Sequence, residues 1–295
     1  MNLLLVANPR AGHHKAGHRL TEIEDVCRNH GLTVNTHLTE RPGHAAEIVE
    51  KSDLSQYDGV IAAGGDGTVF EVVNGLFRNP TGPTVPFGVV PIGTGNSFSR
   101  DLGLERDQVR EALDLIARAT TRKIDVGQCS TGDRDLYFLN ILGVGFVSDV
   151  TATAAKLKLL GNGSYTLGVI YRTAFLSTFQ LALEIDGTTM EREATFLEIS
   201  NSRFTADFLM APDARIDDGL LDITLLGKIS RNRLLRLFPT VFRGEHVQYP
   251  EVETFTAHHI RIVTEQSKVL SPDGELVGTT PAEVACLHQA LDVFC

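Results

Sequence analysis

The spacing of hydrophobic and polar positions changes partway along the chain. Up to about Lys123, short apolar runs alternate with segments whose apolar residues recur at helical spacing. Repeated strand and helix units with short turns predict a mostly parallel, doubly wound α/β sheet. Ligands bind such sheets beyond the carboxyl ends of the strands. The predicted strands cover residues 3–9, 32–40, 59–65 and 87–93, and the predicted helices cover 11–31, 43–52, 68–80 and 107–120.

After Lys123 the pattern becomes alternating and rich in β-formers. Turns such as Asp186-Gly187 separate the runs, and only two helical stretches interrupt them, at 164–179 and 230–244. This pattern predicts an antiparallel, sandwich-like or barrel-like second domain. The predicted β-rich segments cover residues 137–146, 181–191, 193–202, 220–227, 258–265 and 282–294.

The length of 295 residues suits two domains. We predict an α/β domain at 1–124 and a β-rich domain at 125–295. The boundary is expected to be tight, with a cleft between the domains that holds the active site. The C-terminal segment is expected to be able to pack back on the first domain.

Composition and charge narrow the function class. The formal net charge of −10 argues against a bulk nucleic-acid binder but leaves room for a local basic patch that meets a membrane. Apolar runs end well before the ~20 residues of a membrane span, and the start lacks the features of a signal peptide. The four cysteines show no metal-type spacing, and His258-His259 is interpreted as a surface pair. These features predict reduced thiols and a cytoplasmic protein.

The stretch VIAAGGDGTVFEVVNGL, residues 60–76, runs an apolar strand directly into Gly64-Gly65-Asp66-Gly67-Thr68. A tight hairpin turn is the alternative, but the residues that follow have helical rather than alternating spacing. Backbone N–H groups and the positive end of a helix at such a junction can face a phosphate. Asp66 would repel a phosphate, so it makes sense there if a divalent cation bridges the two.

Two further loops follow strands at the same expected edge of the sheet. The loop NPRAG, residues 8–12, offers an amide and bare backbone N–H groups, although a plain turn explains it equally well. The loop PIGTGN, residues 91–96, is a second glycine loop. Together the three loops suggest a phosphate cradle.

Two acidic motifs lie in the second part of the chain. In SPDGE, residues 271–275, a carboxylate at the acceptor could take the proton of an attacking hydroxyl. The second motif, RIDDGL, covers residues 215–220 and precedes a predicted strand. From the residues alone, a type I or II turn and an Asx turn before a strand are the favoured explanations.

The helical stretch 230–244 carries Arg231, Arg233, Arg236 and Arg243 among apolar residues. Such a basic amphipathic segment could rest on an anionic bilayer, or it could cap the second domain with solvated arginines. Pro239 predicts a kink or break. The stretch 164–179 could be core or a wall of an acyl-chain cleft.

The order NPRAG, GGDGT, PIGTGN, DDGLLD (217–222) and SPDGE resembles the soluble diacylglycerol kinase catalytic family of lipid kinases. Sphingosine kinases are similar, and NAD kinases and phosphofructokinases share only related loops. The resemblance spans nearly the whole chain. It implies an ATP- and Mg²⁺-dependent kinase that phosphorylates a hydroxyl of diacylglycerol or a related lipid alcohol, with peripheral contact to a membrane.

The resemblance also assigns roles to residues. It makes Glu275 the general base, with Asp273 oriented towards metal or acceptor. It places Asp66 and Asp125 in a magnesium network. A second Mg²⁺ site would use the side chain of Asp218. The carbonyls of Arg215 and Leu220 would complete that site. The implied nucleotide contacts are Asn8, Thr39, Gly64, Gly65, Asp66, Gly67, Thr68, Glu71, Gly93, Thr94 and Asn96.

One position departs from the pattern of the family. Many relatives carry Asp directly after Asn96, whereas this chain has Ser97, so one carboxylate of the network is missing. Two alternatives to a lipid kinase therefore remain at this stage. One is a kinase of a soluble acceptor such as NAD, and the other is a non-catalytic nucleotide- or lipid-binding relative. A homodimer also stays open.

Overall fold

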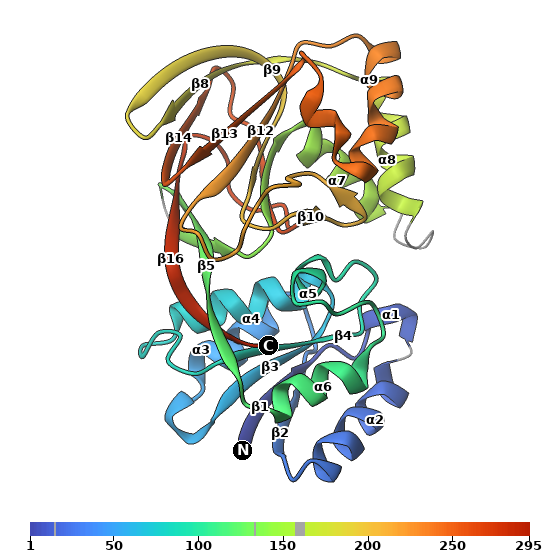
Figure 1. Ribbon diagram of the computed structural model, residues 1–295, viewed down its shortest axis with the longest axis vertical. Helices are drawn as coiled ribbons and strands as arrows, with labels where there is room; N and C mark the ends of the chain where they lie inside the picture. Colours follow the sequence, from blue (N-terminus) through green and yellow to red (C-terminus); the bar gives the residue numbers. More distant parts are fainter. Residues whose placement is uncertain (15, 133, 157–162) are drawn as a thin grey trace. The chain divides into compact units, whose positions relative to one another are not determined.

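The computed structural model describes every residue except 15, 133 and 157–162 (Figure 1). Close contacts divide the chain into two compact units. Unit 1 comprises Met1–Ile124 and Gln289–Cys295, and unit 2 comprises Asp125–His288.

The sheet of unit 1 is parallel, in the order β2-β1-β3-β4, and the end of strand β16 joins it beside β4. Both faces of β3 and of most of β1 are buried, which explains why these strands read as continuous apolar runs. Their carboxyl ends lead into the loops of the candidate site. The strands are β1 (Asn2–Ala7), β2 (Thr33–Leu38), β3 (Gly59–Gly64), β4 (Phe87–Pro91) and β16 (Ala282–Phe294).

Helices cover this sheet on two sides. Helices α2 and α6 pack against each other over a core that includes Leu5, Ile61 and Leu113, and α3 packs against α4. The doubly wound α/β prediction is confirmed. The predicted helix 11–31 includes residue 15, which lies outside the described residues. The helices are α1 (Ala11–His14), α2 (Ala16–Asn29), α3 (His44–Lys51), η1 (Leu54–Gln56), α4 (Asp66–Arg78), α5 (Ser97–Asp101) and α6 (Val109–Ala117).

The main sheet of unit 2 is antiparallel, in the order β13-β12-β9-β8-β14-β16. Strand β9 also pairs with β7, β7 with β15, and β5 with β6. The predicted antiparallel, β-rich second part is therefore confirmed. The strands are β5 (Thr121–Thr131), β6 (Arg134–Phe138), β7 (Ile141–Gly145), β8 (Phe179–Ile185), β9 (Thr188–Ser200), β10 (Phe204–Thr205), β11 (Phe208–Leu209), β12 (Leu221–Gly227), β13 (Val252–Ala257), β14 (His259–Thr264) and β15 (Leu270–Pro272).

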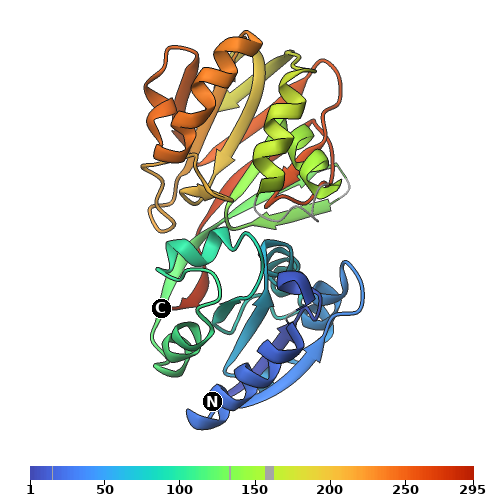
Figure 2. The same ribbon diagram turned by 90° about the vertical axis from the view of Figure 1, so that its right-hand side faces the viewer.

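Helices of unit 2 gather over a second apolar core that includes Phe146, Phe196 and Leu234 (Figure 2). Three of them are α7 (Phe146–Lys156), α8 (Gly163–Thr173) and α9 (Arg231–Leu237), followed by the 3₁₀ segments η3 (Phe238–Arg243) and η4 (Glu245–Gln248). No helix among the described residues is long and apolar enough to cross a membrane.

Two helix predictions in unit 2 were wrong in detail. Helix α7 was not predicted. The alternating apolar pattern before it was assigned as β-strand up to Phe146, where the helix begins. The predicted helix 164–179 ends at Thr173, and strand β8 begins at Phe179. The break predicted at Pro239 is confirmed, since α9 ends at Leu237 and a 3₁₀ turn follows.

Candidate functional site

The two glycine loops of unit 1 are joined through their backbones. The carbonyl of Gly64 accepts hydrogen bonds from the amides of Ile92 at 3.2 Å and Gly93 at 3.0 Å. A Cβ on Gly93 would lie 2.2 Å from the Cα of Gly65. Only glycine permits this approach, so the backbones of the two loops lie in direct contact.

Asp66 is the first residue of α4, and its carboxylate lies at the start of α5. Its Oδ1 accepts a hydrogen bond from the amide of Ser97 at 2.6 Å. A Cβ on Gly95 would lie 2.2 Å from Oδ2, so a larger residue there would displace the Asp66 carboxylate. Burial raises the pKa of the Asp66 carboxyl above its ordinary value. The hydrogen bond from the Ser97 backbone amide opposes this rise only in part. Ser97 thus contacts Asp66 without supplying a carboxylate.

The loop that follows β1 joins the same group of residues. The side-chain amide of Asn8 contacts the Thr68 hydroxyl at 3.4 Å, and its oxygen accepts from the amide of Arg10 at 2.9 Å. The amide of Thr39, after β2, donates to the carbonyl of Ala7 at 2.9 Å. The carboxyl ends of β1, β2 and β3 therefore bring Asn8, Thr39 and Thr68 to one edge of the sheet.

Two residues that were predicted to contact the nucleotide form side-chain hydrogen bonds with other parts of the protein. The carboxylate of Glu71 accepts from the amides of Gly43 at 2.7 Å and Ala45 at 3.0 Å, at the start of α3. The side chain of Asn96, which is buried, accepts from the amide of Gly93 and donates to its carbonyl. These two side chains hold loops in place, and the backbone of the loops is what can meet an anion.

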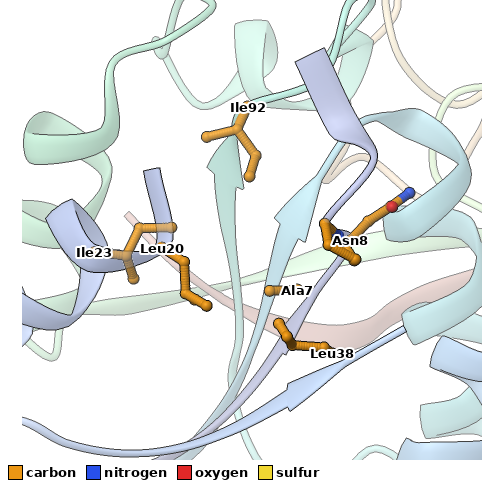
Figure 3. Close-up of a pocket in the computed structure, with 7 residues that line it drawn as sticks. Ala7, Asn8, Leu20, Ile23, Leu38 and Ile92 are labelled. Carbon is orange, nitrogen blue, oxygen red and sulfur yellow. The ribbon is translucent and has the colours of Figure 1, made fainter. Parts of the chain in front are cut away.

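A small cavity of about 60 Å³ lies next to these loops (Figure 3). Apart from Asn8, the side chains around it are apolar, and they come from β1, β2, α2 and the residue after β4. This almost wholly apolar lining does not suit the charged phosphates of a nucleotide. The cavity is lined by Ala7, Asn8, Pro9, Leu20, Ile23, Leu38 and Ile92.

In unit 2, Asp273 and Glu275 lie on a tight turn after β15. The amide of Glu275 donates to the carbonyl of Pro272 at 2.8 Å, and both central residues have positive φ, 46° at Asp273 and 83° at Gly274. The turn is therefore of type I′ rather than the expected type I or II. Glycine and aspartate tolerate this conformation, which leaves Glu275 partly exposed.

The carboxylate of Asp273 is buried and points at backbone amides. It accepts hydrogen bonds from Leu139 at 2.9 Å, Asn140 at 2.8 Å and Ile141 at 3.0 Å. Its geometry fits a residue that fixes the turn, whereas the sequence-based expectation oriented it towards metal or acceptor.

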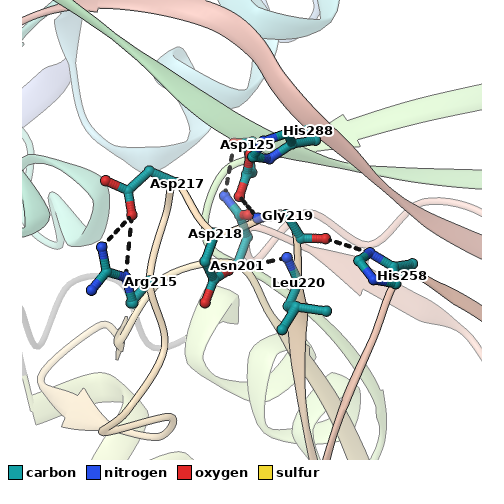
Figure 4. A network of polar contacts seen from close by, with 9 residues as sticks. All are labelled: Asp125, Asn201, Arg215, Asp217, Asp218, Gly219, Leu220, His258 and His288. Carbon is teal, nitrogen blue, oxygen red and sulfur yellow. Dashed lines mark hydrogen bonds and ion pairs between the residues drawn. The ribbon is translucent and has the colours of Figure 1, made fainter.

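Asp125 is completely buried and has a partner at each carboxylate oxygen (Figure 4). Oδ2 accepts from the amide of Gly219 at 2.6 Å, and Oδ1 lies 2.8 Å from Nδ1 of His288. The Nδ1 of His258 lies 2.8 Å from the carbonyl of Gly219. His258 is exposed, in agreement with its interpretation as a surface residue, and it contacts the DDGL loop that Asp125 also holds.

Asp218 forms the Asx turn that the residues alone favoured. Its Oδ1 accepts from the amide of Leu220 at 3.0 Å, and the guanidinium of Arg215 pairs with Asp217 at 3.2 Å (Figure 4). Burial, followed by repulsion from Asp218 and Asp213, raises the pKa of Asp222 to about 6. Uncompensated negative charge therefore gathers around this loop.

Asn201 joins the acidic motifs of unit 2 into one network. Its side-chain amide donates to the carbonyls of Asp125 and Leu139, both at 3.0 Å. Leu139 in turn donates to Asp273. The structure thus links the KIDVG, DDGL and SPDGE segments, which are separated by 50 to 150 residues. Among the described residues there is no group of three or more His, Cys, Asp or Glu side chains arranged to hold a metal by themselves.

Comparison with known proteins covers the same two parts of the chain. Residues 2–129 match the diacylglycerol kinase catalytic domain, and residues 140–295 match the YegS C-terminal NAD kinase beta sandwich-like domain. The curated diacylglycerol kinase of Bacillus subtilis (strain 168) is 30% identical over 98% of this chain and 94% of its own length. The chain belongs to the diacylglycerol kinase family.

Further members of the diacylglycerol kinase family support this assignment. The Staphylococcus aureus diacylglycerol kinase (strain MRSA252) is 32% identical over 98% of this chain and 91% of its own length. A solved structure of a candidate diacylglycerol kinase from Bacillus anthracis str. Sterne aligns with a TM-score of 0.83 at 27% identity. That alignment covers 99% of this chain and 94% of the other.

The sequence analysis missed several residues of the candidate site in unit 2. Asn201 and His288 carry no local motif, and Asp222, although it is the last residue of the DDGLLD motif, was assigned no role. Asn201 and His288 contact Asp125 from 76 and 163 positions away in sequence. Glu198 was also missed. It is buried, the Thr205 hydroxyl donates to it at 2.7 Å, and burial raises its pKa to about 7. A single sequence contains no signal for such distant pairs.

Proposed function

We propose that this protein is an ATP- and Mg²⁺-dependent lipid kinase that transfers the γ-phosphoryl group to a hydroxyl of diacylglycerol or a related lipid alcohol. The likeness to curated diacylglycerol kinases along 98% of the chain carries this proposal. The glycine loops and the acidic network described above supply residues that fit the reaction.

In unit 1 the backbone of three loops would bind the phosphates of ATP. The two glycines that meet here, Gly65 and Gly93, add no side chain at the start of α4, which suits a phosphate there. Glu71 and Asn96 would act indirectly, because their side chains hold the loops. The partly exposed Thr39 and the exposed Thr94 remain available for direct contact.

The donor set fits magnesium at two places. Asp66, whose partly buried carboxylate lies at the start of α4 and accepts a hydrogen bond from the amide of Ser97, would anchor the ion that accompanies ATP. Asp125 would support it less directly, since both its oxygens have partners within unit 2. Asp218, with the carbonyls of Arg215 and Leu220, would hold the second ion, and the repulsion felt by Asp222 supports a cation there. Bound Mg²⁺ would supply charge neutralisation at the transferring phosphoryl group.

In unit 2, Glu275 would be the catalytic base. It would accept the proton of the lipid hydroxyl as the oxygen attacks the γ-phosphorus and ADP leaves. Asp273 would be a positioning residue, because its three backbone bonds fix the turn that carries Glu275. The larger part of the rate enhancement would come from alignment and charge neutralisation.

A phosphoryl-transfer assay with γ-labelled ATP and Mg²⁺ tests the proposal. We expect label in lipid when mixed micelles of diacylglycerol are offered, and more than about 100-fold less transfer in Asp66→Ala. A matched control is Asp25→Ala, which removes an exposed carboxylate that pairs with Arg28 on the surface of α2.

The same assay separates the alternatives. Label found only in NAD would replace the lipid kinase with a kinase of a soluble acceptor. Nucleotide binding without transfer to either acceptor would favour a binding protein, and the missing carboxylate at Ser97 would then be the first feature to alter.

A further inference from the structure

Two exposed histidines lie beside the acidic loop of unit 2, residues 215–220 (Figure 4). Nδ1 of His258 lies 2.8 Å from the carbonyl oxygen of Gly219. Nδ1 of His288 lies 2.8 Å from Oδ1 of Asp125, and the other oxygen of this carboxylate accepts from the amide of Gly219 at 2.6 Å. One histidine directly and the other through Asp125 therefore act on the same residue, Gly219.

The two peptide groups on either side of Gly219 are both held by these contacts. The N–H of Gly219 belongs to the peptide group shared with Asp218, and it donates to Asp125. The C=O of Gly219 belongs to the peptide group shared with Leu220, and it faces His258. In that second peptide group the N–H of Leu220 donates to Oδ1 of Asp218 at 3.0 Å. Rotation of either peptide group would break a hydrogen bond, so the contacts fix the path of the loop backbone.

The partners of the two imidazoles determine which ring nitrogen carries hydrogen. A carbonyl oxygen offers only lone pairs, so Nδ1 of His258 must be a donor. The same holds for His288, because the carboxylate of Asp125 is an acceptor. Both histidines therefore act through an Nδ1–H group, which one neutral tautomer and the charged ring both possess.

The backbone around His258 is itself held in place. The carboxylate of Asp186 accepts from the amides of His258 at 3.2 Å and His259 at 2.8 Å. The carbonyl of His258 accepts from the amide of Cys286 at 2.9 Å. The imidazole thus extends from a fixed point of unit 2 towards the acidic loop.

Asp125 and His288 also hold the loop by packing and by a backbone contact. The amide of Asp125 donates to the carbonyl of Ile216 at 2.7 Å, so Asp125 meets the loop at two points. Gly219 has a φ of 82°, and a Cβ on it would lie 3.0 Å from Nδ1 of His288. Both the backbone conformation and the close ring favour glycine at this position.

The loop that is held in this way presents an oxygen to solvent. Asp218 is exposed, and only its Oδ1 accepts a hydrogen bond within the described part of the chain. The nearby guanidinium of Arg215 pairs with Asp217 at 3.2 Å. An exposed carboxylate oxygen beside backbone carbonyls is a donor set that suits Mg²⁺.

We infer that His258 and His288 are positioning residues of a cation site in the acidic loop, His258 directly and His288 through Asp125. The inference rests on the proposed function, which assigns the second Mg²⁺ to this loop. By fixing both peptide groups of Gly219, the histidines keep the oxygen donors of the loop arranged before the ion binds, so less order has to be gained on binding. Residues that hold metal ligands in this way typically change metal affinity 10- to 100-fold when they are replaced.

Calorimetric titration of the full chain with Mn²⁺, without nucleotide or lipid, tests this inference apart from catalysis. Mn²⁺ takes the same oxygen ligands as Mg²⁺, and the binding that Asp218→Ala removes belongs to this loop. We expect His258→Ala and His288→Ala each to weaken that binding about tenfold or more. In His258→Asn and His288→Asn the side-chain amide can donate from near the position of Nδ1, so affinity should stay within about threefold of the wild type.

The variant Asp125→Asn shows whether His288 acts through this carboxylate. When Asp125→Asn is already present, His288→Ala should change Mn²⁺ affinity by less than about threefold, because the contact that it removes is already altered. His258→Ala should still weaken binding in the same background, since its contact with Gly219 does not involve Asp125.

Two other histidines provide matched controls. His259 is exposed and directly follows His258 in the sequence. His30 in unit 1 forms an imidazole–carboxylate pair with Asp114, also at 2.8 Å. His259→Ala and His30→Ala should bind Mn²⁺ like the wild type. Thermal unfolding of every variant in EDTA, followed by circular dichroism, checks that the fold is kept.

Four results would overturn the inference. The alanine variants of His258 and His288 could bind Mn²⁺ as tightly as the wild type, the asparagine variants could bind it as weakly as the alanine variants, the two histidine controls could lose as much affinity, or the wild type could show no Mn²⁺ binding that depends on Asp218. If the wild type phosphorylates no lipid but binds Mn²⁺ with the expected dependence on both histidines, the proposed function fails and the inference stands. If it phosphorylates diacylglycerol while the alanine variants bind Mn²⁺ like the wild type, the inference alone fails.

Discussion

The two units build their candidate site loops in different ways. In unit 1 the loops meet through backbone atoms, and glycines such as Gly65 and Gly93 make the contact. In unit 2 the loops are held by buried carboxylates, with Asp273 accepting from three amides and Asp125 from Gly219 and His288. The first design leaves N–H groups for a phosphate, and the second uses charge to hold a turn rigid. The comparison teaches that an acidic motif residue can act by holding other residues in place.

Glu198 differs from the other buried carboxylates of unit 2 in the partner that it has. It is buried in unit 2 and receives a bond from Thr205 rather than from backbone amides, and its pKa is raised from 4.5 to about 7 by burial. The folded chain therefore keeps a proton that the unfolded chain releases between these pH values. The free energy of unfolding should fall as pH rises from 4.5 to 7, by up to about 3 kcal/mol.

Urea denaturation of Glu198→Gln across this pH range checks that prediction. The variant should lose this part of the pH dependence, while Glu191→Gln, an exposed position on the same strand, should keep it. Parallel pH profiles for the wild type and Glu198→Gln would show that Glu198 does not hold a proton in the fold.

Asp273→Asn tests the anchoring role of a carboxylate in unit 2. An amide group presents N–H donors to the backbone N–H groups of Leu139, Asn140 and Ile141, so some of these bonds must be lost. We expect a loss of about 2 kcal/mol in the free energy of unfolding at pH 7. Asp25→Asn, on the surface of α2, should change it by less than about 0.5 kcal/mol. Equal stability of the wild type and Asp273→Asn would remove the anchoring role.

Gly93→Ala tests the backbone contact in unit 1. The added Cβ would lie 2.2 Å from the Cα of Gly65, so the two loops must separate, at a cost of about 1–2 kcal/mol in stability. ATP affinity measured by calorimetry should fall with it. At Gly132 a Cβ meets nothing within 4 Å, which makes Gly132→Ala the matched control. Unchanged affinity and stability in Gly93→Ala would contradict the close packing of the loops.

The sequence predicted the design of unit 1 far better than that of unit 2. The GGDGT and PIGTGN loops follow apolar strands directly, so local spacing alone sets their place at the edge of a parallel sheet. In unit 2 the partners of the Asp273 and Asp125 carboxylates lie more than 90 positions away along the chain, and no local pattern indicates them. Helix α7 was missed for a related reason, because its apolar side is defined by a core that distant strands complete.

The central claim is that Glu275 accepts the proton of a lipid hydroxyl during phosphoryl transfer from ATP. The most direct measurement is kcat of Glu275→Gln with diacylglycerol in mixed micelles, alongside calorimetric titration of ATP with Mg²⁺. We predict that kcat falls roughly 10²- to 10⁴-fold, whereas ATP affinity and the free energy of unfolding stay close to those of the wild type. An unchanged kcat in Glu275→Gln would contradict the account.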